Sequence, residues 1–241
     1  MSLPMTSDKT PPRWVVGDGP ALDFLDRACA AMLAGALRAA VQTRGEASLA
    51  VAGGRTPEAA LRFLSEEDVD WSRVTVSLVD ERWVEPASPD SNERLVRQHL
   101  LRGRAGAARF IPMKSDSPDP DEAAFVAALP PAPFDAVLLG MGEDGHFASL
   151  FPDSPVLGQG LDPASTRRVI AVPRADQGAP PQPRLSLTLA EIARAGLIVL
   201  LVKGKEKQDV IDSAQREGAD PRRLPIAALF AQRRDVRVLQ A

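Results

Sequence analysis

Two side chains able to move a proton lie two residues apart in the sequence Gly-Met-Gly-Glu-Asp-Gly-His, which ends at His146. His146 is one of two histidines in 241 residues, and histidine is the side chain that changes charge between about pH 5 and 8. Its ring is suited to general-base chemistry, in which it takes a proton from water or a hydroxyl group. Asp144 is close enough in sequence to orient that ring, although the intervening glycine leaves open whether the two side chains touch.

The segment before this pair has the composition of a buried strand. Residues 136–139 are Ala-Val-Leu-Leu, and the apolar run breaks at Gly140. Because ligands of parallel α/β proteins bind beyond the carboxyl ends of the strands, this position favours a functional His146 over a structural or solvent-exposed histidine. Ser149 completes a Ser/His/Asp inventory, but the chain has no Gly-x-Ser-x-Gly elbow, which favours a serine that caps the following turn over a nucleophile.

Three other predicted strands also end in residues that carry chemistry. Parallel strands share one carboxyl edge, so we expect these groups to converge with His146. The strands and the residues that follow them are 48–52 with Gly53-Gly54-Arg55-Thr56, 74–79 with Asp80-Glu81-Arg82, and 197–202 with Lys203-Gly204-Lys205.

The turn 53–56 is a candidate phosphate cradle. Glycines let the backbone approach a ligand closely, and the N-terminus of a following helix offers unpaired N–H groups with partial positive charge. We expect Thr56 to be the N-cap of that helix, and Arg55 to add further donors. The spacing is not that of a P-loop, so an ordinary strand-to-helix turn is the alternative. A lysine on the same edge, such as Lys205, favours the phosphate interpretation.

Arg82 is the candidate for stabilising negative charge that develops during a reaction. Its planar guanidinium can grip an anion or an oxyanion through two parallel hydrogen bonds. Three adjacent charges are also typical of a surface ion-pair cluster, which contributes little to stability. The position of Asp80 and Arg82 directly after a predicted strand favours a functional role.

Composition argues against several classes of protein. The apolar content of 44% is enough for a packed core, yet no apolar run approaches the ~20 residues that span a bilayer, and we see no signal-peptide pattern. The single cysteine, Cys29, excludes an internal disulfide, lies on an apolar helical pattern that predicts burial, and fits a reducing cytoplasm. A net charge of −3 without a basic stripe argues against nucleic acid, and two isolated histidines offer no metal-ligand spacing.

Short apolar strands alternate with amphipathic helices along the chain, which predicts an α/β protein with a mainly parallel sheet and helices on both faces. We expect a flexible N-terminal tail over residues 1–13 and a single α/β domain over 14–241, because no long linker divides the chain. Further strands are expected at 109–112, 168–172, 184–189 (half-exposed) and 236–239. Helices are expected at 20–41, from 56 onward, and at 92–101, 121–129, 191–195 and 205–215.

At these residues the chain resembles the 6-phosphogluconolactonase family, over nearly its whole length from about residue 14. The most specific match runs from Gly140 to Pro152, Gly-Met-Gly-Glu-Asp-Gly-His-Phe-Ala-Ser-Leu-Phe-Pro. Arg55 stands where the family commonly has a small hydroxyl residue, and Phe147 where it has threonine, which puts the phosphate grip and the entry into a following helix in question. The supporting matches are Gly53-Gly54-x-Thr56-Pro57, Asp80-Glu81-Arg82, Ser91-Asn92, Arg184 with Ser186 and Thr188, and Gly204-x-x-Lys207.

The resemblance implies a Rossmann-like α/β fold, shared with glucosamine-6-phosphate deaminases and ribose-5-phosphate isomerases. It also implies hydrolysis of 6-phospho-D-glucono-1,5-lactone to 6-phospho-D-gluconate in the oxidative pentose phosphate pathway. His146 would activate water as general base, Arg82 would stabilise the oxyanion and Asp144 would orient His146. The residues expected to bind the substrate and its phosphate are Gly53, Gly54, Arg55, Thr56, Asp80, Arg184 and Lys205, and the choice among Lys203, Lys205 and Lys207 is left open.

The expected partner is a small sugar-phosphate lactone, with no cofactor, no metal, no nucleic acid and no membrane, and the expected assembly is a monomer or small homo-oligomer. One rival is a sugar-phosphate isomerase or deaminase on the same fold. Such deaminases usually carry asparagine before Gly-His, so Asp144 and the tail 148–152 favour the lactonase. The other rival is a sugar-phosphate-sensing domain without catalysis. It usually accompanies a DNA-binding module, for which we find neither room before residue 14 nor a basic recognition helix.

Overall fold

The computed structural model describes residues 13–15, 20–175 and 181–241. Within these residues the strands form two sheets, and every pair in the larger sheet is parallel. In spatial order, the large sheet contains β1 (Arg13–Val15), β10 (Arg237–Gln240), β9 (Leu197–Val202), β6 (Ala136–Leu139), β2 (Ala47–Val51), β3 (Val74–Leu78) and β5 (Arg109–Phe110). The small sheet is antiparallel and contains β4 (Asp80–Arg82), β8 (Arg184–Leu187) and β7 (Val169–Val172).

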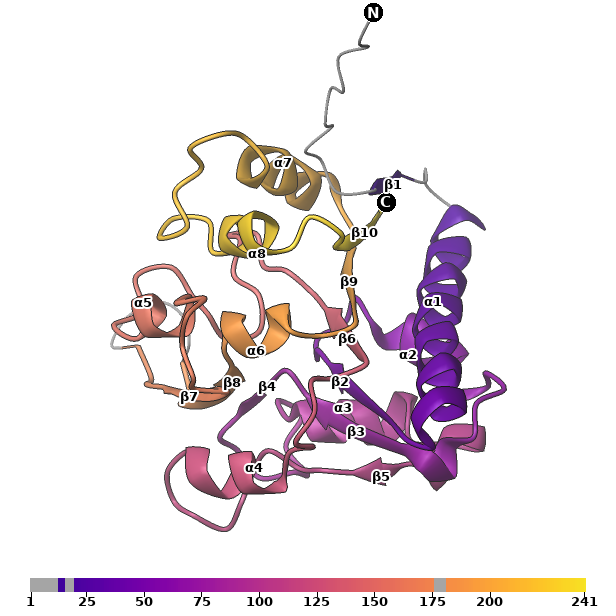
Figure 1. Cartoon of the computed structure of the whole chain (residues 1–241). Coiled ribbons are helices and arrows are strands. Elements are labelled where there is room, and N and C mark those ends of the chain that lie inside the picture. The colour runs from indigo at the N-terminus through magenta and orange to yellow at the C-terminus, as the bar shows by residue number, and fades with distance from the viewer. Residues whose placement is uncertain (1–12, 16–19, 176–180) are drawn as a thin grey trace, which may run out of the picture.

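Helices cover both faces of the large sheet, as the alternating pattern predicts (Figure 1). The long α1 packs against strands β2, β6 and β9 together with its neighbour α2, and α6 and α8 lie on the other side. The helices are α1 (Pro20–Arg44), α2 (Glu58–Ser65), α3 (Asn92–His99), α4 (Glu122–Ala128), α5 (Leu157–Gly160), α6 (Leu189–Ala193), α7 (Lys205–Ala214) and α8 (Ile226–Gln232), with 3-10 turns at Trp71–Arg73 and Gly103–Ala107.

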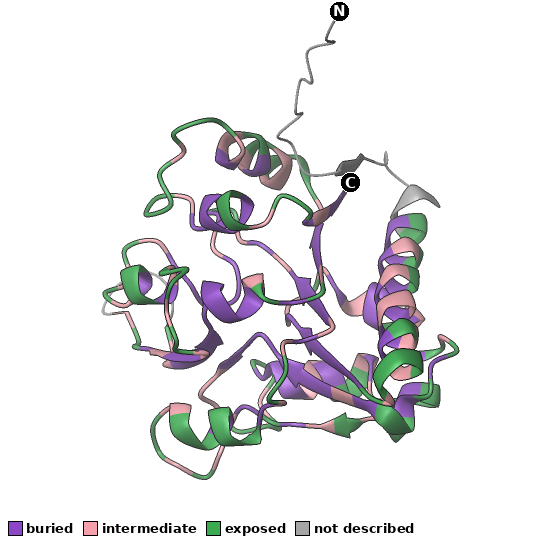
Figure 2. Cartoon of the chain, in the orientation of Figure 1, coloured by how far each residue is buried: buried purple, intermediate pink, exposed green. Residues whose placement is uncertain are grey.

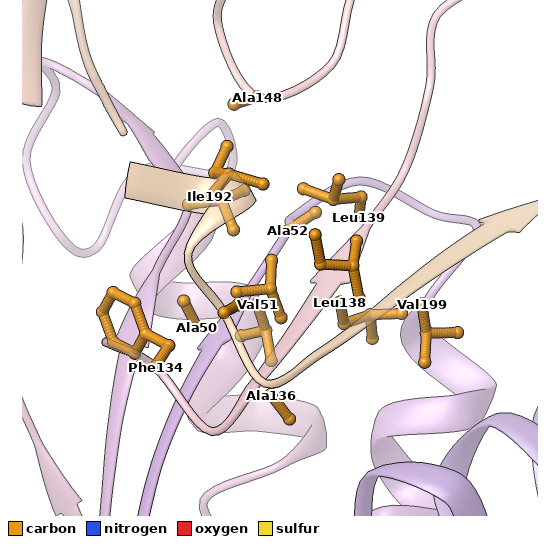
Figure 3. Close-up of a cluster of buried hydrophobic side chains, with 14 of the residues drawn as sticks. Ala50, Val51, Ala52, Phe134, Ala136, Leu138, Leu139, Ala148, Ile192 and Val199 are labelled. Carbon is orange, nitrogen blue, oxygen red and sulfur yellow. The ribbon is translucent and has the colours of Figure 1, made fainter. Parts of the chain in front are cut away.

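The core of the protein lies between these helical layers. Strands β2 and β6 are buried at every position, because both of their faces are covered by helices (Figure 2). Figure 3 shows their side chains, including Val51 and Leu138, packed together with Val199 of β9 and Ile192 of α6. Cys29 on α1 belongs to this core, and burial raises the pKa of its thiol. The predicted burial of Cys29 is therefore confirmed.

The order of the strands creates a crevice at one place in the large sheet. From β2 the chain adds β3 and then β5 on one side, and it afterwards crosses back to add β6, β9 and β10 on the other. The sequence order therefore reverses between β2 and β6. Doubly wound sheets bind their ligands beyond the carboxyl ends of the strands at such a switch point.

Most predicted elements are confirmed, with some differences at their ends. The strands 136–139 and 197–202 match in both bounds, whereas β1, the small strand β4 and helices α5 and α8 were not predicted. The expected tail overlaps β1 by one residue, Arg13, and residues 1–12 lie outside the described part of the chain. No helix within the described residues is long and apolar enough to cross a membrane.

The expectation of a half-exposed strand at 184–189 is wrong. Strand β8 is buried at all four positions, because it lies between β4 and β7 in the small sheet. Its alternating polar residues bond to other polar groups of the protein instead of facing solvent. The backbone N–H of Ser149 donates to Ser186 Oγ at 3.1 Å, and the Arg184 guanidinium lies 3.6 Å from the Asp80 carboxylate.

Candidate active site

A cavity of about 310 Å³ opens at the switch point, beyond the carboxyl ends of β2 and β6. It brings together residues that follow three of the four strands singled out from the sequence, while the fourth strand contributes through the helix after it. The lining residues are Ala52, Gly53, Gly54, Arg55, Thr56, Pro57, Asp80, Arg82, Asn92, Gly140, Met141, Gly142, His146, Ala148, Arg184 and Lys207.

His146 lines this cavity, and Asp144, which lies just outside the lining, touches it. His146 Nδ1 lies 2.5 Å from Asp144 Oδ1, and the backbone N–H of His146 donates to the same oxygen at 3.2 Å. Burial raises the pKa of Asp144, but the hydrogen bonds with His146 outweigh burial and hold it below its ordinary value. An ionised carboxylate only accepts hydrogen bonds, so Nδ1 carries the proton and Nε2 is left as the basic nitrogen.

Glycine at position 142 makes this contact possible. A Cβ placed on Gly142 would overlap the side chains of both His146 and Asp144. The turn is closed by the N–H of Gly142, which donates to the carbonyl of His146 at 2.9 Å, and by the left-handed Gly145 with φ of 76°. The two glycines therefore fold the segment tightly enough to place two residues separated by a glycine in hydrogen-bonding contact.

The buried ring of Phe151 connects the histidine to a nearby cation. Its centroid lies 4.3 Å from that of His146, and the guanidinium carbon of Arg184 lies 5.1 Å from it on a cation–π contact. One aromatic side chain thus packs against both His146 and Arg184. This role was missed in the sequence analysis. The available signal was that Phe151 follows His146 by five residues within the same motif.

The small sheet places two arginines side by side. Arg82 of β4 and Arg184 of β8 are directly opposite partners in the antiparallel ladder, and both line the cavity. Like charges in this position destabilise a sheet. Among the described residues, neither Arg82 Nε nor Arg184 Nε has a hydrogen-bond partner although both atoms are buried. The pair is therefore suited to an anionic ligand, which would supply both the missing acceptor and the missing charge.

Asp80 is the carboxylate that partly balances these cations. It projects from the same face of β4 as Arg82, since residues two apart on a strand share a face. Burial lowers the pKa of the Arg184 guanidinium, and the nearby Asp80 offsets part of that effect. The Ser149 hydroxyl donates to Asp80 at 2.5 Å, and Ser149 itself is fully buried. Ser149 is therefore a support for Asp80, which corrects the expectation that it caps the following turn.

The turn 53–56 lies against the cavity through its whole length, but its helix begins later than expected. The N-cap of α2 is Pro57, without a side-chain cap, and Thr56 is not the N-cap. A tight turn in which the Glu58 N–H donates to the Arg55 carbonyl at 3.4 Å comes first and shifts the helix by one residue. The Thr56 hydroxyl is consequently not used as a cap, and Arg55 is exposed at the cavity wall.

The three late lysines have different surroundings. Lys205 is exposed in the first turn of α7 and does not line the cavity, whereas Lys207 does. Lys203 Nζ makes two hydrogen bonds, of 2.7 and 2.8 Å, to the buried carboxylate of Asp26 on α1. Lys207 is therefore the one of these three lysines that lines the cavity, whereas the predicted Lys205 does not. Residues 203–207 lie across the start of a helix, so their directions were not predictable from spacing alone.

Phe147 stands where the family commonly has threonine, which raises the question of how it affects entry into a following helix. Phe147 begins no helix. It is fully buried and forms an isolated bridge with Leu150, and the next helix, α5, starts at Leu157. Its neighbour Ala148 takes a left-handed φ of 49°, which turns the chain past the cavity. Within the described ranges, no cluster of three or more His, Cys, Asp or Glu side chains is arranged to hold a metal ion.

The cavity lies at the switch point of a parallel α/β sheet and is lined by cations and by a histidine that a carboxylate holds from behind. Such a site is suited to a small anion and to proton transfer. Comparison with known proteins gives the family. The family described as glucosamine-6-phosphate isomerases/6-phosphogluconolactonase matches residues 21–238. The chain belongs to this family.

Similar proteins cover most of the chain. A protein of Caulobacter vibrioides named 6-phosphogluconolactonase is 47% identical over 218 residues, which cover 89% of this chain and 91% of that protein. A protein of Pseudomonas aeruginosa with the same name is 46% identical over 210 residues, covering 85% and 86%. The crystal structure of a 6-phosphogluconolactonase from Shewanella baltica superimposes with a TM-score of 0.85 at 36% identity, covering 99% of this chain and 100% of that chain.

Proposed function

We propose that the chain hydrolyses 6-phospho-D-glucono-1,5-lactone to 6-phospho-D-gluconate, a step of the oxidative pentose phosphate pathway. The observation that carries the proposal is that His146, held by Asp144, lines the same cavity as Arg82, Arg184 and Lys207. Relatives named 6-phosphogluconolactonase at 47% and 46% identity support this reaction over the isomerase chemistry that the family also includes.

In this mechanism His146 is the general base. Its Nε2 takes a proton from water as the water oxygen attacks the lactone carbonyl carbon, and Asp144 stabilises the imidazolium that forms. Arg82 stabilises the negative charge on the carbonyl oxygen of the tetrahedral intermediate. The bond between that carbon and the ring oxygen then breaks, and His146 returns its proton to the ring oxygen. The product is the open-chain 6-phosphogluconic acid, which ionises in water.

The rest of the cavity is proposed to anchor the phosphate. The backbone of Gly53 and Gly54, the side chains of Arg55 and Thr56, and the cations Arg184 and Lys207 line a continuous surface. A dianionic phosphate is the group that this arrangement of N–H donors and positive charges favours. Binding energy at the phosphate holds the lactone ring next to His146 and lowers the entropic part of the barrier. Asp80 balances the charge of this cation cluster.

The test is formation of 6-phosphogluconate from freshly prepared lactone. The product is coupled to 6-phosphogluconate dehydrogenase and read as NADPH, with the uncatalysed hydrolysis subtracted. We expect an enzyme-dependent rate that saturates with lactone concentration. Light scattering on the same preparation measures the molar mass and so tests the expected monomer or small homo-oligomer.

Two parallel assays separate the rivals. Release of ammonia from glucosamine 6-phosphate, with no excess lactone hydrolysis, would assign the chain to the deaminase chemistry of its family. Tight binding of 6-phosphogluconate without turnover of either substrate would favour a sensing role. Either result would overturn the proposed lactonase activity.

A further inference from the structure

The buried carboxylate of Glu81 lies next to the site without being part of its surface. Asp80 and Arg82 flank it in β4 and both line the cavity, whereas Glu81 does not. Successive side chains of a strand point to opposite faces, so Glu81 points away from the cavity toward the N-terminus of α3. It is 1% exposed, and an ionised carboxylate at that depth is costly unless its oxygens are well supplied with hydrogen bonds.

Both oxygens of Glu81 are supplied by donors. Oε1 accepts from the backbone N–H groups of Arg82 at 2.7 Å and Asn92 at 2.8 Å. Oε2 accepts from the Ser91 hydroxyl at 3.0 Å and from the backbone N–H of Glu93 at 2.8 Å. Two of these N–H groups belong to the first turn of α3, where helices leave donors unpaired and carry partial positive charge.

These contacts indicate an ionised carboxylate. Burial raises the pKa of Glu81 above its ordinary value, and the hydrogen bonds from Asn92, Glu93 and Arg82 offset only part of that effect, so the donor geometry is what favours the ionised form. The three backbone N–H groups can only donate, and only the Ser91 hydroxyl could accept a proton from Glu81, so an ionised carboxylate is the form in which both oxygens are free to accept from all four partners. Glu81 therefore ties β4 to the start of α3 through charge-assisted hydrogen bonds, which are stronger than neutral ones.

The two segments that Glu81 joins both carry cavity residues. Asn92 donates through Nδ2 to the Asp80 carbonyl at 2.8 Å, and a Cβ placed on Gly53 would overlap its carboxamide. Arg82 donates from Nη1 to the carbonyl of Asp90 at 2.6 Å, just before α3. The position of the Arg82 guanidinium and of the Asn92 amide thus depends on where α3 begins relative to β4.

We propose that Glu81 is a positioning residue of the site, which acts on the reaction by holding Arg82 and Asn92 in place. This inference rests on the proposed lactone hydrolysis. The contribution of Glu81 to binding differs between the ground state and the transition state. The lactone carbonyl is neutral before attack, whereas the tetrahedral intermediate and the carboxylate of the product are anionic at the oxygen that faces Arg82. Loss of Glu81 therefore weakens the binding of the two anionic species more than that of the substrate.

The test compares E81Q with the matched control E93Q. Glu93 is also buried and lies in the first turn of α3, but its carboxylate pairs with Arg97 Nε at 2.8 Å. Glutamine at position 81 turns an NH₂ group toward groups that donate. Relative to E93Q, we expect kcat of E81Q to fall by about tenfold or more while KM changes by less than about threefold. The Kd for 6-phosphogluconate, measured by calorimetry, should rise by about fivefold or more.

Urea unfolding of both variants shows how much of each protein is folded, and the kinetic constants are taken per folded molecule. If E81Q fails to fold, S91A removes one of the four donors to Glu81 and should lower kcat by about twofold to fivefold with KM unchanged. The proposal is overturned if E81Q has the same kinetic constants and the same affinity for 6-phosphogluconate as the E93Q control. If E81Q does not fold, an unchanged kcat in S91A overturns it.

The outcomes for Glu81 and for the proposed function are separable. If the wild-type chain does not hydrolyse the lactone, the proposed function fails, and the affinity for 6-phosphogluconate then decides the role of Glu81. Weaker binding of 6-phosphogluconate to E81Q than to E93Q would still support the positioning of Arg82 by Glu81. Equal binding of 6-phosphogluconate by the two variants would overturn the role of Glu81 as well.

Discussion

The large and small sheets meet at the same cavity but bury different kinds of side chain. In β6 all four buried residues are apolar, whereas the short β4 buries Asp80 and Glu81, and β8 buries Arg184 and Ser186. The parallel sheet provides a rigid base whose strand ends determine where the site lies. The antiparallel sheet provides most of the charge. The cationic site thus combines an apolar core in the large sheet with a small sheet whose charged and polar side chains bond to one another.

The largest effect is expected at the end of the parallel sheet, where the proposed base follows β6. In H146A the proton acceptor is lost, so kcat should fall by about 10²–10⁴-fold with KM little changed. The side chain of His146 is 28% exposed, so the free energy of unfolding should stay near that of the wild type. The coupled NADPH assay and urea unfolding measure the two quantities. Undiminished turnover would refute the role of His146.

The second prediction concerns the core of the parallel sheet. In L138A the fully buried side chain of β6 is cut back and leaves a cavity, which should lower the free energy of unfolding by about 3–4 kcal/mol. Because Leu138 makes no part of the cavity lining, kcat and KM per folded molecule should stay within about twofold. A tenfold loss of kcat in folded L138A would show that the parallel sheet does more than support the site.

The third prediction is the counterpart in the small sheet. In D80N the buried Arg184 loses its carboxylate partner, which should cost about 2 kcal/mol of stability. Unlike L138A, this change should also raise KM, by about fivefold or more, because the guanidinium is no longer held at the cavity wall. The contrast between the two variants is the sharpest test of the difference between the sheets. Unchanged KM in D80N would indicate that Asp80 is purely structural.

The smallest effect is expected for Asp144 and depends on pH. The hydrogen bonds with His146 hold the pKa of Asp144 below its ordinary value, so its stabilising contribution is present above that value and is lost as the pH falls through the lowered one. The side chain is 45% exposed, which limits this contribution to less than about 1 kcal/mol. Urea unfolding of wild type and D144N should therefore differ slightly near neutral pH and converge in acid. A difference that grows in acid would contradict the assignment.

Much of the parallel sheet could be read from the sequence, since apolar runs such as 136–139 and 197–202 are local signals. Two strands of the small sheet were also predicted, at 168–172 and 184–189, but neither β4 nor the pairing of the three strands in a separate sheet was. Strand β4 is short and charged, so it has no apolar pattern, and β8 shows an alternation that is normally typical of an exposed face. Burial of the polar residues of β8 depends on partners that lie far away in sequence, such as Asp80 and Ser149.

The sequence by itself determined the α/β class, the carboxyl edge where chemistry gathers, and the motif that contains Asp144 and His146. Only the tertiary structure decided that Gly142 leaves room for these two side chains to touch, that Arg82 and Arg184 are opposite partners in one ladder, and that Lys207 faces the cavity. The physical reason is range. Hydrophobic period and turn chemistry act over a few residues, whereas the direction of a polar side chain at a site depends on partners brought close by folding.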